Sequence, residues 1–280
     1  STLMRSSAAS DVYKRQRKYS MGIFDGILIL SDFDGTFAGE GGRIIDRNIS
    51  AIEYFRANGG HFSFSTGRLP SVMSRIFPDF RTVSNAPLIM CNGALVYEPS
   101  EGKILRESWF DGASGRKMAD DVLSRFPSMS LAVYPDDMEY HGKIKPEDVP
   151  GDRWHKARFN RDDDPQLVSD CRDYLLRNYG DSYNIFRSWY NVVEIVDKSS
   201  AKGNCIDFIK NYLKNGGCGE MTAFCIGDYE NDIDMLKRAD YAFCPSNAID
   251  EVKALCQPPL CHHDRGAVAD LIETIRNSYI

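Results

Sequence analysis

The chain has 280 residues, of which 42% are hydrophobic and 26% charged, enough for one large globular domain or two smaller ones. A net charge of -6 provides no basic surface for nucleic acid, so an anionic substrate must be met by local positive charge. No apolar run approaches the ~18 residues of a membrane span, and the 8 cysteines show no disulfide-like framework. We expect a soluble protein of the reducing cytoplasm that binds neither nucleic acid nor membranes and acts as a monomer or a homodimer.

The first twenty residues differ in character from the rest of the chain. They are polar and basic and lack the apolar stretch of a secretory signal. The segment SSAASDVYKRQ resembles a translated sequencing adapter, and Met21 is the natural start. We therefore predict that residues 1–20 are a disordered or artefactual leader. A basic, Ser-rich transit peptide is the alternative, although the segment lacks an amphipathic apolar face.

From residue 21 onward, apolar strand-like segments end in small or polar residues. The first is ILIL at 27–30, and the helical pattern after it, with Asp46 or Asn48 as the expected cap, begins a βαβ unit. The other four segments are HFSFSTGR at 61–68, PLIMCNG at 87–93, TAFCIGD at 222–228 and YAFCPSN at 241–247. Because parallel strands end at one edge of their sheet, five such endings predict a shared crevice there.

The middle of the chain follows a different pattern. A helix is predicted over 112–126, a strand pair in SLAVYP and MEYHG, a helix over 165–180, and a second pair in YNIFRSW and NVVEIV. The stretch 143–165 is charged and contains proline, so we interpret it as a loop. The predicted fold is α/β. A Rossmann-like parallel-sheet core is formed by residues 21–108 and 197–280, with an inserted α+β cap domain at 109–196.

Two aspartates follow the first strand. Asp32 and Asp34 are two residues apart on an extended chain and so point the same way. Two like charges held together are unfavourable unless a cation bridges them or one of them holds a proton. Both conditions are useful to an enzyme. Taken alone, the pair is also compatible with a simple turn before Gly35.

Four motifs occur in order along the chain. They are DFDGT at 32–36, Thr66 in TGR, Lys202 in SSAKGN, and GDYEND at 227–232. This set resembles the haloacid dehalogenase superfamily. The long insert between the second and third motifs, with SNA at 246–248 and DRGAV at 264–268, resembles its Cof-type branch of sugar-phosphate phosphatases. The likeness spans about residues 27–270.

The resemblance implies Mg²⁺-dependent hydrolysis of a small phosphorylated metabolite through an aspartyl-phosphate. A carboxylate beside Mg²⁺ supplies the oxygen nucleophile while the ion neutralises charge, and Asp32 matches that nucleophile. Asp34 matches the residue that protonates the leaving alcohol and then takes a proton from water. Thr66, Gly67 and Lys202 would bind the phosphoryl oxygens, with Thr66 and Lys202 counted in the catalytic set.

The same resemblance assigns a metal site. Asp32, the backbone carbonyl of Asp34, and Asp228 would hold Mg²⁺. Asn231 and Asp232 would orient Asp228 or the waters around the ion. We leave Arg68 out of the catalytic set, because stacking on a helix or a salt bridge in the core would explain it as well.

Two further functions stay open. A phosphomutase would share the aspartyl-phosphate but return the phosphoryl group to a sugar, and a regulator would bind a phosphorylated metabolite without turnover. A zinc site in Cys256, Cys261, His262 and His263 is disfavoured because Cys-x4-Cys-His-His is not a known zinc spacing. The three tryptophans are typical of core or hairpin packing, although one of them could face the substrate.

Overall fold

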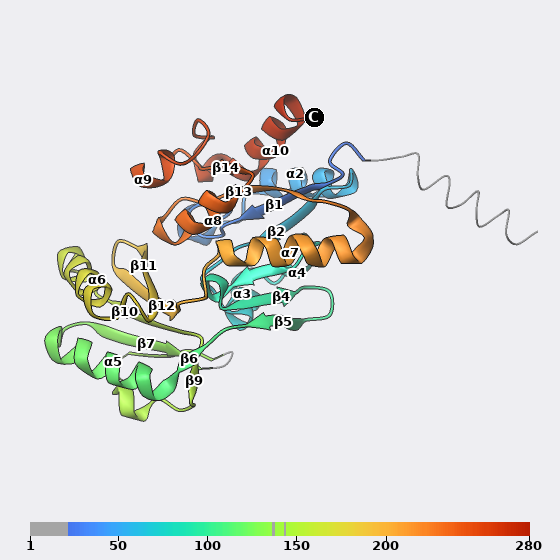
Figure 1. Cartoon of the computed structure of the whole chain (residues 1–280). Coiled ribbons are helices and arrows are strands. Elements are labelled where there is room, and N and C mark those ends of the chain that lie inside the picture. The colour runs from blue at the N-terminus through green and yellow to red at the C-terminus, as the bar shows by residue number, and fades with distance from the viewer. Residues whose placement is uncertain (1–21, 136–137, 143) are drawn as a thin grey trace, which may run out of the picture.

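The chain forms a parallel sheet and a separate antiparallel sheet in a computed structural model that describes residues 22–135, 138–142 and 144–280 (Figure 1). The parallel sheet has the order β14-β13-β1-β2. Its strands are β1 (Ile27–Ser31), β2 (His61–Phe64), β13 (Thr222–Ile226) and β14 (Tyr241–Phe243). This sheet confirms the predicted α/β fold. The predicted leader and Met21 lie outside the described residues.

Strand β1 is buried on both faces, as its aliphatic run predicts. Ile29 points into one hydrophobic cluster, whereas Leu28 and Leu30 point into another. The first cluster is covered by α2 (Asp46–Ala57) and α10 (Ala267–Ser278), and the second by α7 (Ile206–Leu213) and α8 (Ile233–Arg238). Helices on both faces of a parallel sheet make a three-layer core.

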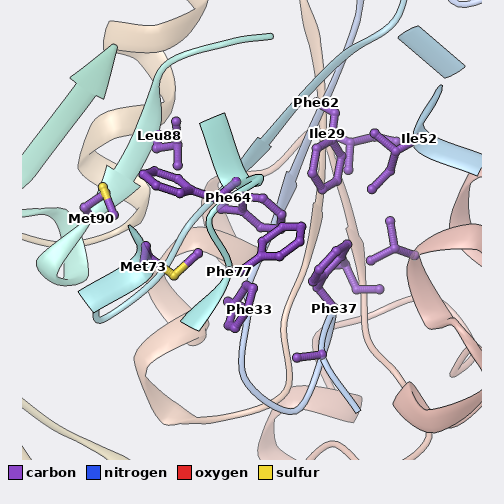
Figure 2. Packing of buried hydrophobic residues seen from close by; sticks show 14 of the residues in the cluster. Ile29, Phe33, Phe37, Ile52, Phe62, Phe64, Met73, Phe77, Leu88 and Met90 are labelled. Atoms are coloured by element: carbon purple, nitrogen blue, oxygen red, sulfur yellow. The ribbon is translucent and has the colours of Figure 1, made fainter. Parts of the chain in front are cut away.

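The first cluster is unusually rich in phenylalanine. Phe33, Phe37, Phe62, Phe64 and Phe77 pack with ring centroids about 5 to 6 Å apart, mostly edge to face or tilted (Figure 2). Phe33 lies between the two aspartates of DFDGT and Phe37 directly follows the motif, so this packing fixes the loop that carries both aspartates.

The start of α2 differs from the prediction. The residue before the helix is Ile45, and no side chain caps it. Asn48 is instead buried, where its amide donates to the Phe37 carbonyl and accepts from the Ala269 amide. Asn48 therefore ties the helix to the loop after β1 and to α10.

The segment after β2 contains elements that the sequence pattern did not reveal. Ser65 and Ile89 form a parallel bridge, which places β3 (Leu88–Met90) beside the end of β2. β3 then pairs antiparallel with β4 (Leu95–Glu98), and β4 with β5 (Lys103–Glu107). The short helices around them are α3 (Pro70–Ile76) and α4 (Phe80–Val83), and α9 (Asp250–Lys253) lies near the C-terminus. No described helix is both long and apolar enough to cross a membrane.

The antiparallel sheet has the order β11-β12-β10-β7-β8. It contains both predicted strand pairs and is accompanied by both predicted helices. The elements are α5 (Gly112–Arg125), β7 (Ser130–Tyr134), β8 (Tyr140–Gly142), β10 (Lys156–Asn160), α6 (Pro165–Tyr179), β11 (Tyr183–Trp189) and β12 (Val192–Asp197). We keep the name cap for residues 109–196, whose limits stay a prediction.

The loop predicted over 143–165 is wrong in its second half. β9 (Arg153–Trp154) pairs with β6 (Phe110–Asp111), and β10 lies between β7 and β12 in the cap sheet. The sequence KARFN alternates faces: Ala157 and Phe159 are buried with the cap helices, whereas Lys156 and Arg158 point the other way. That second face meets the core instead of solvent. A charged segment was therefore predicted as a loop although it is a central strand of the cap sheet.

The cap sheet turns its polar face toward the core. Ala132 and Tyr134 of β7 belong to the hydrophobic cluster of the core, and their neighbours Leu131 and Val133 belong to that of the cap. Register places Lys156 opposite Tyr134. The face that carries Tyr134, Lys156 and Arg158 therefore lines a cavity that the ends of the parallel strands line from the core.

We predict that Gly115→Ala destabilises the cap. A Cβ at Gly115 would lie 2.6 Å from Trp154 Cε3, closer than packed carbons approach. The expected loss in unfolding free energy is about 1–3 kcal/mol, measured by urea titration followed by circular dichroism. Gly216→Ala is the matched control, because no atom lies within 4 Å of a Cβ there. Equal stability of the two variants would contradict this packing.

Candidate active site

A buried lysine joins two of the predicted motifs. Lys202 Nζ lies 2.6 Å from Asp32 Oδ1 and 2.6 Å from Asp232 Oδ1, and its side chain is completely buried. Asp32 follows β1, Asp232 follows β13, and Lys202 precedes α7. The edge of the parallel sheet thus gathers residues from distant parts of the chain, since Lys202 is 170 positions from Asp32 and 30 from Asp232.

The electrostatics of this cluster follow from burial. Burial, and then the charge of Asp232, raises the pKa of Asp32 well above its usual value. Burial and the same neighbour raise the pKa of Asp228 to about 7. Burial alone would lower the pKa of Lys202, but the charges of Asp232 and Asp32 outweigh it and hold that pKa above its ordinary value. One ammonium therefore faces more negative charge than it can neutralise.

Asp228 is held against the first motif. Thr36 Oγ1 donates to Asp228 Oδ1 at 2.7 Å, and both residues are buried. Gly35 has φ +75°, and a Cβ on it would lie 2.5 Å from Asp228 Oδ2. Glycine is required there both for the left-handed backbone and for this close approach.

Asp232 orders the loop in which it lies. Its Oδ2 accepts from the backbone N–H of Asp228 at 3.0 Å and of Tyr229 at 3.3 Å. Asn231 Nδ2 donates to Asn92 Oδ1 at 3.3 Å. Asp232 thus contacts the Asp228 backbone directly, whereas Asn231 contacts Asn92.

Thr66 and Gly67 stand beside this cluster, at the end of β2. The Thr66 amide donates to the Ile89 carbonyl at 2.8 Å, and Thr66 Oγ1 accepts from the backbone N–H of Arg68 at 3.2 Å. The Thr66 hydroxyl oxygen therefore accepts a hydrogen bond from its own loop, and its O–H group can donate at the same time.

Arg68 forms a two-pronged ion pair with Asp34. Arg68 Nε lies 2.7 Å from Asp34 Oδ2, and its terminal nitrogen lies 2.6 Å from Asp34 Oδ1. The hydrogen bonds and charge of Asp34 outweigh burial and raise the pKa of Arg68. The sequence analysis left Arg68 out. The position of Arg68 directly after Thr66-Gly67, at the end of a strand, was the signal that could have placed it among the predicted site residues.

A cavity of about 690 Å³ lies between the parallel sheet and the cap, and Gly67 and Arg68 line it whereas Thr66 and Lys202 lie behind its lining. Asp32, Asp34 and Asp228 lie on the core side, and the cap contributes Tyr134, Lys156, Arg158, Trp189 and Glu194. Of the three tryptophans, Trp189 lines the cavity, where its ring centroid is 5.6 Å from that of Tyr229. Trp154 is fully buried in the cap, as packing residues are.

The acidic cluster fits a divalent cation. Carboxylate oxygens of Asp32, Asp228 and Asp232 lie within 4.8 Å of one another. All are hard oxygen donors, and the raised pKa values of Asp32 and Asp228 mark negative charge that a cation would relieve. Asp232 already binds Lys202 and two backbone amides, so Asp32 and Asp228 are the better candidates for direct ligands.

The alternative zinc cluster is not assembled as its sequence order suggested. Among the described residues, His262 and His263 group with Asp264, and neither Cys256 nor Cys261 joins them. His263 Nδ1 lies 2.8 Å from the Ala38 carbonyl, and Asp264 receives the Glu40 amide. These side chains secure the loop after β1 at the mouth of the cavity.

We predict that Lys202→Met destabilises the metal-free protein by about 3–5 kcal/mol, because it leaves Asp32 and Asp232 buried without their cation. Mg²⁺ should recover part of the loss by neutralising the same carboxylates. Denaturant titration with and without Mg²⁺ measures both effects.

The control is Lys210→Met. Lys210 also contacts a carboxylate at 2.6 Å, that of Asp240, but both side chains are partly exposed. Its loss should stay below about 1 kcal/mol and be insensitive to Mg²⁺. If the two lysine variants lose the same stability, the Lys202 ammonium does not neutralise the cluster.

Comparison with known proteins places this geometry in a family. A family model described as haloacid dehalogenase-like hydrolase matches residues 29–164 and 140–272. The 5-amino-6-(5-phospho-D-ribitylamino)uracil phosphatase YitU of Bacillus subtilis is 23% identical over 279 residues, covering 88% of this chain and 96% of that protein. The chloroplastic endoribonuclease YBEY of Arabidopsis thaliana is 33% identical over 106 residues, which cover 38% of this chain and only 18% of that protein.

The fold has close counterparts among solved structures. A HAD/COF-like hydrolase from Plasmodium vivax superposes with a TM-score of 0.76 at 20% identity, covering 91% of this chain and 97% of that one. The family model covers most of the chain, including all four predicted motifs. The chain therefore belongs to the haloacid dehalogenase-like hydrolase family and is a phosphatase, as those motifs predict.

Proposed function

We propose that this phosphatase hydrolyses a small phosphomonoester with Mg²⁺, through an aspartyl-phosphate on Asp32. The observation that carries the proposal is the position of Asp32, buried at the floor of the cavity with Oδ1 on the Lys202 ammonium. Lys202 fixes the carboxylate, and Oδ2 is the oxygen that we assign to attack. Relatives such as YitU, named as a phosphatase of a phosphorylated metabolite, support the substrate class.

In the first half-reaction, Asp32 Oδ2 attacks phosphorus and the bond to the leaving alcohol breaks. Asp34 gives its proton to the alkoxide that leaves. In the second half-reaction, Asp34 takes a proton from water as that water attacks the same phosphorus. Inorganic phosphate departs and Asp32 is restored as a carboxylate.

Arg68 has a part in this proton transfer. Its guanidinium holds both oxygens of the Asp34 carboxylate by hydrogen bonds. An arriving phosphate offers the guanidinium another pair of anionic oxygens. Asp34 is then released from Arg68 and can hold the proton that the leaving group needs.

The phosphoryl oxygens require donors, and the protein supplies them locally. We assign the Thr66 hydroxyl, the Gly67 backbone amide and the Lys202 ammonium to these oxygens. Mg²⁺ bound to Asp32, the Asp34 carbonyl and Asp228 would neutralise charge on the same oxygens. Asn231 and Asp232 hold the Asp228 loop in place for this task.

We predict that Asp32→Asn lowers turnover of p-nitrophenyl phosphate by at least about 10³-fold while the protein stays folded, because the amide keeps the shape but not the nucleophile. Steady-state rates and circular dichroism of purified variants check this. Substantial residual turnover in a folded variant would mean that another group attacks phosphorus.

Asp34→Asn should separate the two half-reactions. p-Nitrophenolate leaves without a proton, so the first step should persist while hydrolysis of the intermediate slows by about 10²–10⁴-fold. The expected signature is a rapid burst of about one p-nitrophenolate per enzyme, followed by slow turnover, seen by stopped-flow absorbance. For an alkyl phosphate, both steps should slow. Wild-type rates on both esters would exclude Asp34 as the acid and base.

A further inference from the structure

A buried ion pair lies on the face of the cap sheet that meets the core. Lys156 Nζ is 2.6 Å from Glu194 Oε1, and the two side chains are only 4% and 5% exposed. They stand on adjacent antiparallel strands as diagonal neighbours, since Arg158 is the residue directly opposite Glu194. The ammonium also lies 4.4 Å from the ring centroid of Tyr134.

The lysine reaches beyond its own sheet. Lys156 Nζ donates to the Gly67 carbonyl oxygen at 2.8 Å. The opposite end of the same peptide plane, the N–H of Arg68, donates to Thr66 Oγ1 at 3.2 Å. Both ends of the Gly67–Arg68 peptide are therefore fixed, the carbonyl by the cap and the amide by the Thr66 hydroxyl oxygen. Rotation of this peptide would remove the Arg68 N–H from the Thr66 hydroxyl oxygen, and the hydroxyl would lose the contact that orients it.

Glu194 fixes the other side of the same loop. Its Oε2 accepts from Asn92 Nδ2, and the backbone N–H of Asn92 donates to the Thr66 carbonyl at 3.1 Å. A Cβ on Gly67 would lie 3.0 Å from Asn92 Nδ2, so this side chain packs directly on the loop. Asn92 also accepts from Asn231 in the Asp228 loop. The ion pair thus contacts the Gly67 loop directly and reaches the Asp228 loop only through Asn92.

Stability does not explain this arrangement well. Desolvation of two charges offsets much of their attraction, and apolar replacements of buried ion pairs are often neutral or stabilising. Lys156 and Glu194 both belong to the cap, which already has an ion pair to the core, because Arg187 Nε lies 2.6 Å from Glu230 Oε1. What distinguishes Lys156 is its bond to the Gly67 carbonyl.

We propose that Lys156 is a positioning residue that acts through the Gly67–Arg68 peptide on the Thr66 hydroxyl, with Glu194 and Asn92 holding the lysine and the loop in register. The cap then completes the phosphoryl-binding loop in addition to covering the cavity. This inference rests on the proposed role of Thr66 in binding the phosphoryl group.

A double-mutant cycle of Lys156→Met and Thr66→Val tests the proposal. Two quantities are measured: kcat/KM for p-nitrophenyl phosphate, and the Kd of inorganic phosphate in the presence of Mg²⁺ by calorimetry. In the otherwise wild-type protein, K156M should reduce kcat/KM by about 10- to 100-fold and weaken phosphate binding. In the T66V background it should cost less than about threefold, because the hydroxyl that it positions is gone.

Two variants guard against a folding artefact. K156M leaves Glu194 buried and unpaired, so K156M/E194Q removes both charges together and should reproduce the loss in a folded protein. Arg187→Met removes an ion pair between cap and core that does not touch the Gly67 loop, and its effect should be the same in the wild-type and T66V backgrounds. Non-additivity of R187M with T66V would mean that seating of the cap, and not Lys156, positions the loop.

The remaining outcomes decide between this inference and the proposed function. Normal turnover with additive effects of K156M and T66V overturns the inference alone. If the wild-type protein binds phosphate but hydrolyses no ester, the proposed function fails, and the cycle in phosphate Kd still decides the role of Lys156. A wild-type protein that neither binds phosphate nor turns over an ester overturns both.

Discussion

The site depends on the charge of one buried lysine. Asp32, Asp228 and Asp232 come from two separate strand ends and would repel one another in a place that water hardly reaches. Lys202 lies between two of them and makes their proximity possible. It neutralises only part of the negative charge, and burial together with the charge of Asp232 still raises the pKa values of Asp32 and Asp228. A site that is still too negative when its own lysine is counted is suited to a cation and then to an anionic phosphate.

The sheet supplies the geometry that this charge requires. Strands β1, β2 and β13 are parallel and adjacent, so the residues after them meet at one edge. Phenylalanines pack around the DFDGT turn on one face of the sheet, while Thr36 and Gly35 bring the turn against Asp228. The apolar layers thereby fix the positions of side chains that, on electrostatic grounds, would separate.

Much of this could be predicted from the sequence because strand ends carry a local signal. ILIL followed by Asp32 and Asp34 marks both a buried strand and the edge where it ends, and the same holds for TAFCIGD before Asp228. The family resemblance, which the family model confirms, added Thr66 and Lys202. The positions of these residues agree with the assigned roles, which remain proposals.

The residues that escaped prediction depend on contacts between elements far apart in the chain. KARFN was interpreted as part of a loop because the stretch around it is long, charged and contains proline, whereas Lys156 and Arg158 in fact face a cavity. Nothing near Lys156 in the sequence identifies Gly67, 89 positions away, as its partner. Arg68 was visible but ambiguous in the sequence, and only the structure shows that its guanidinium pairs with Asp34.

The bond between Lys156 and the Gly67 carbonyl bears on how such a protein can diversify. A cap that is joined to the core only by two chain connections could be exchanged for another cap, which would change the substrate specificity of the enzyme. Here the cap also holds a peptide of the core's own ligand loop. A different cap would therefore need a hydrogen-bond donor in the position of the Lys156 ammonium, together with an acceptor such as Glu194 to hold that donor. An insert without this donor would leave the Gly67 carbonyl without the contact that the present cap gives it.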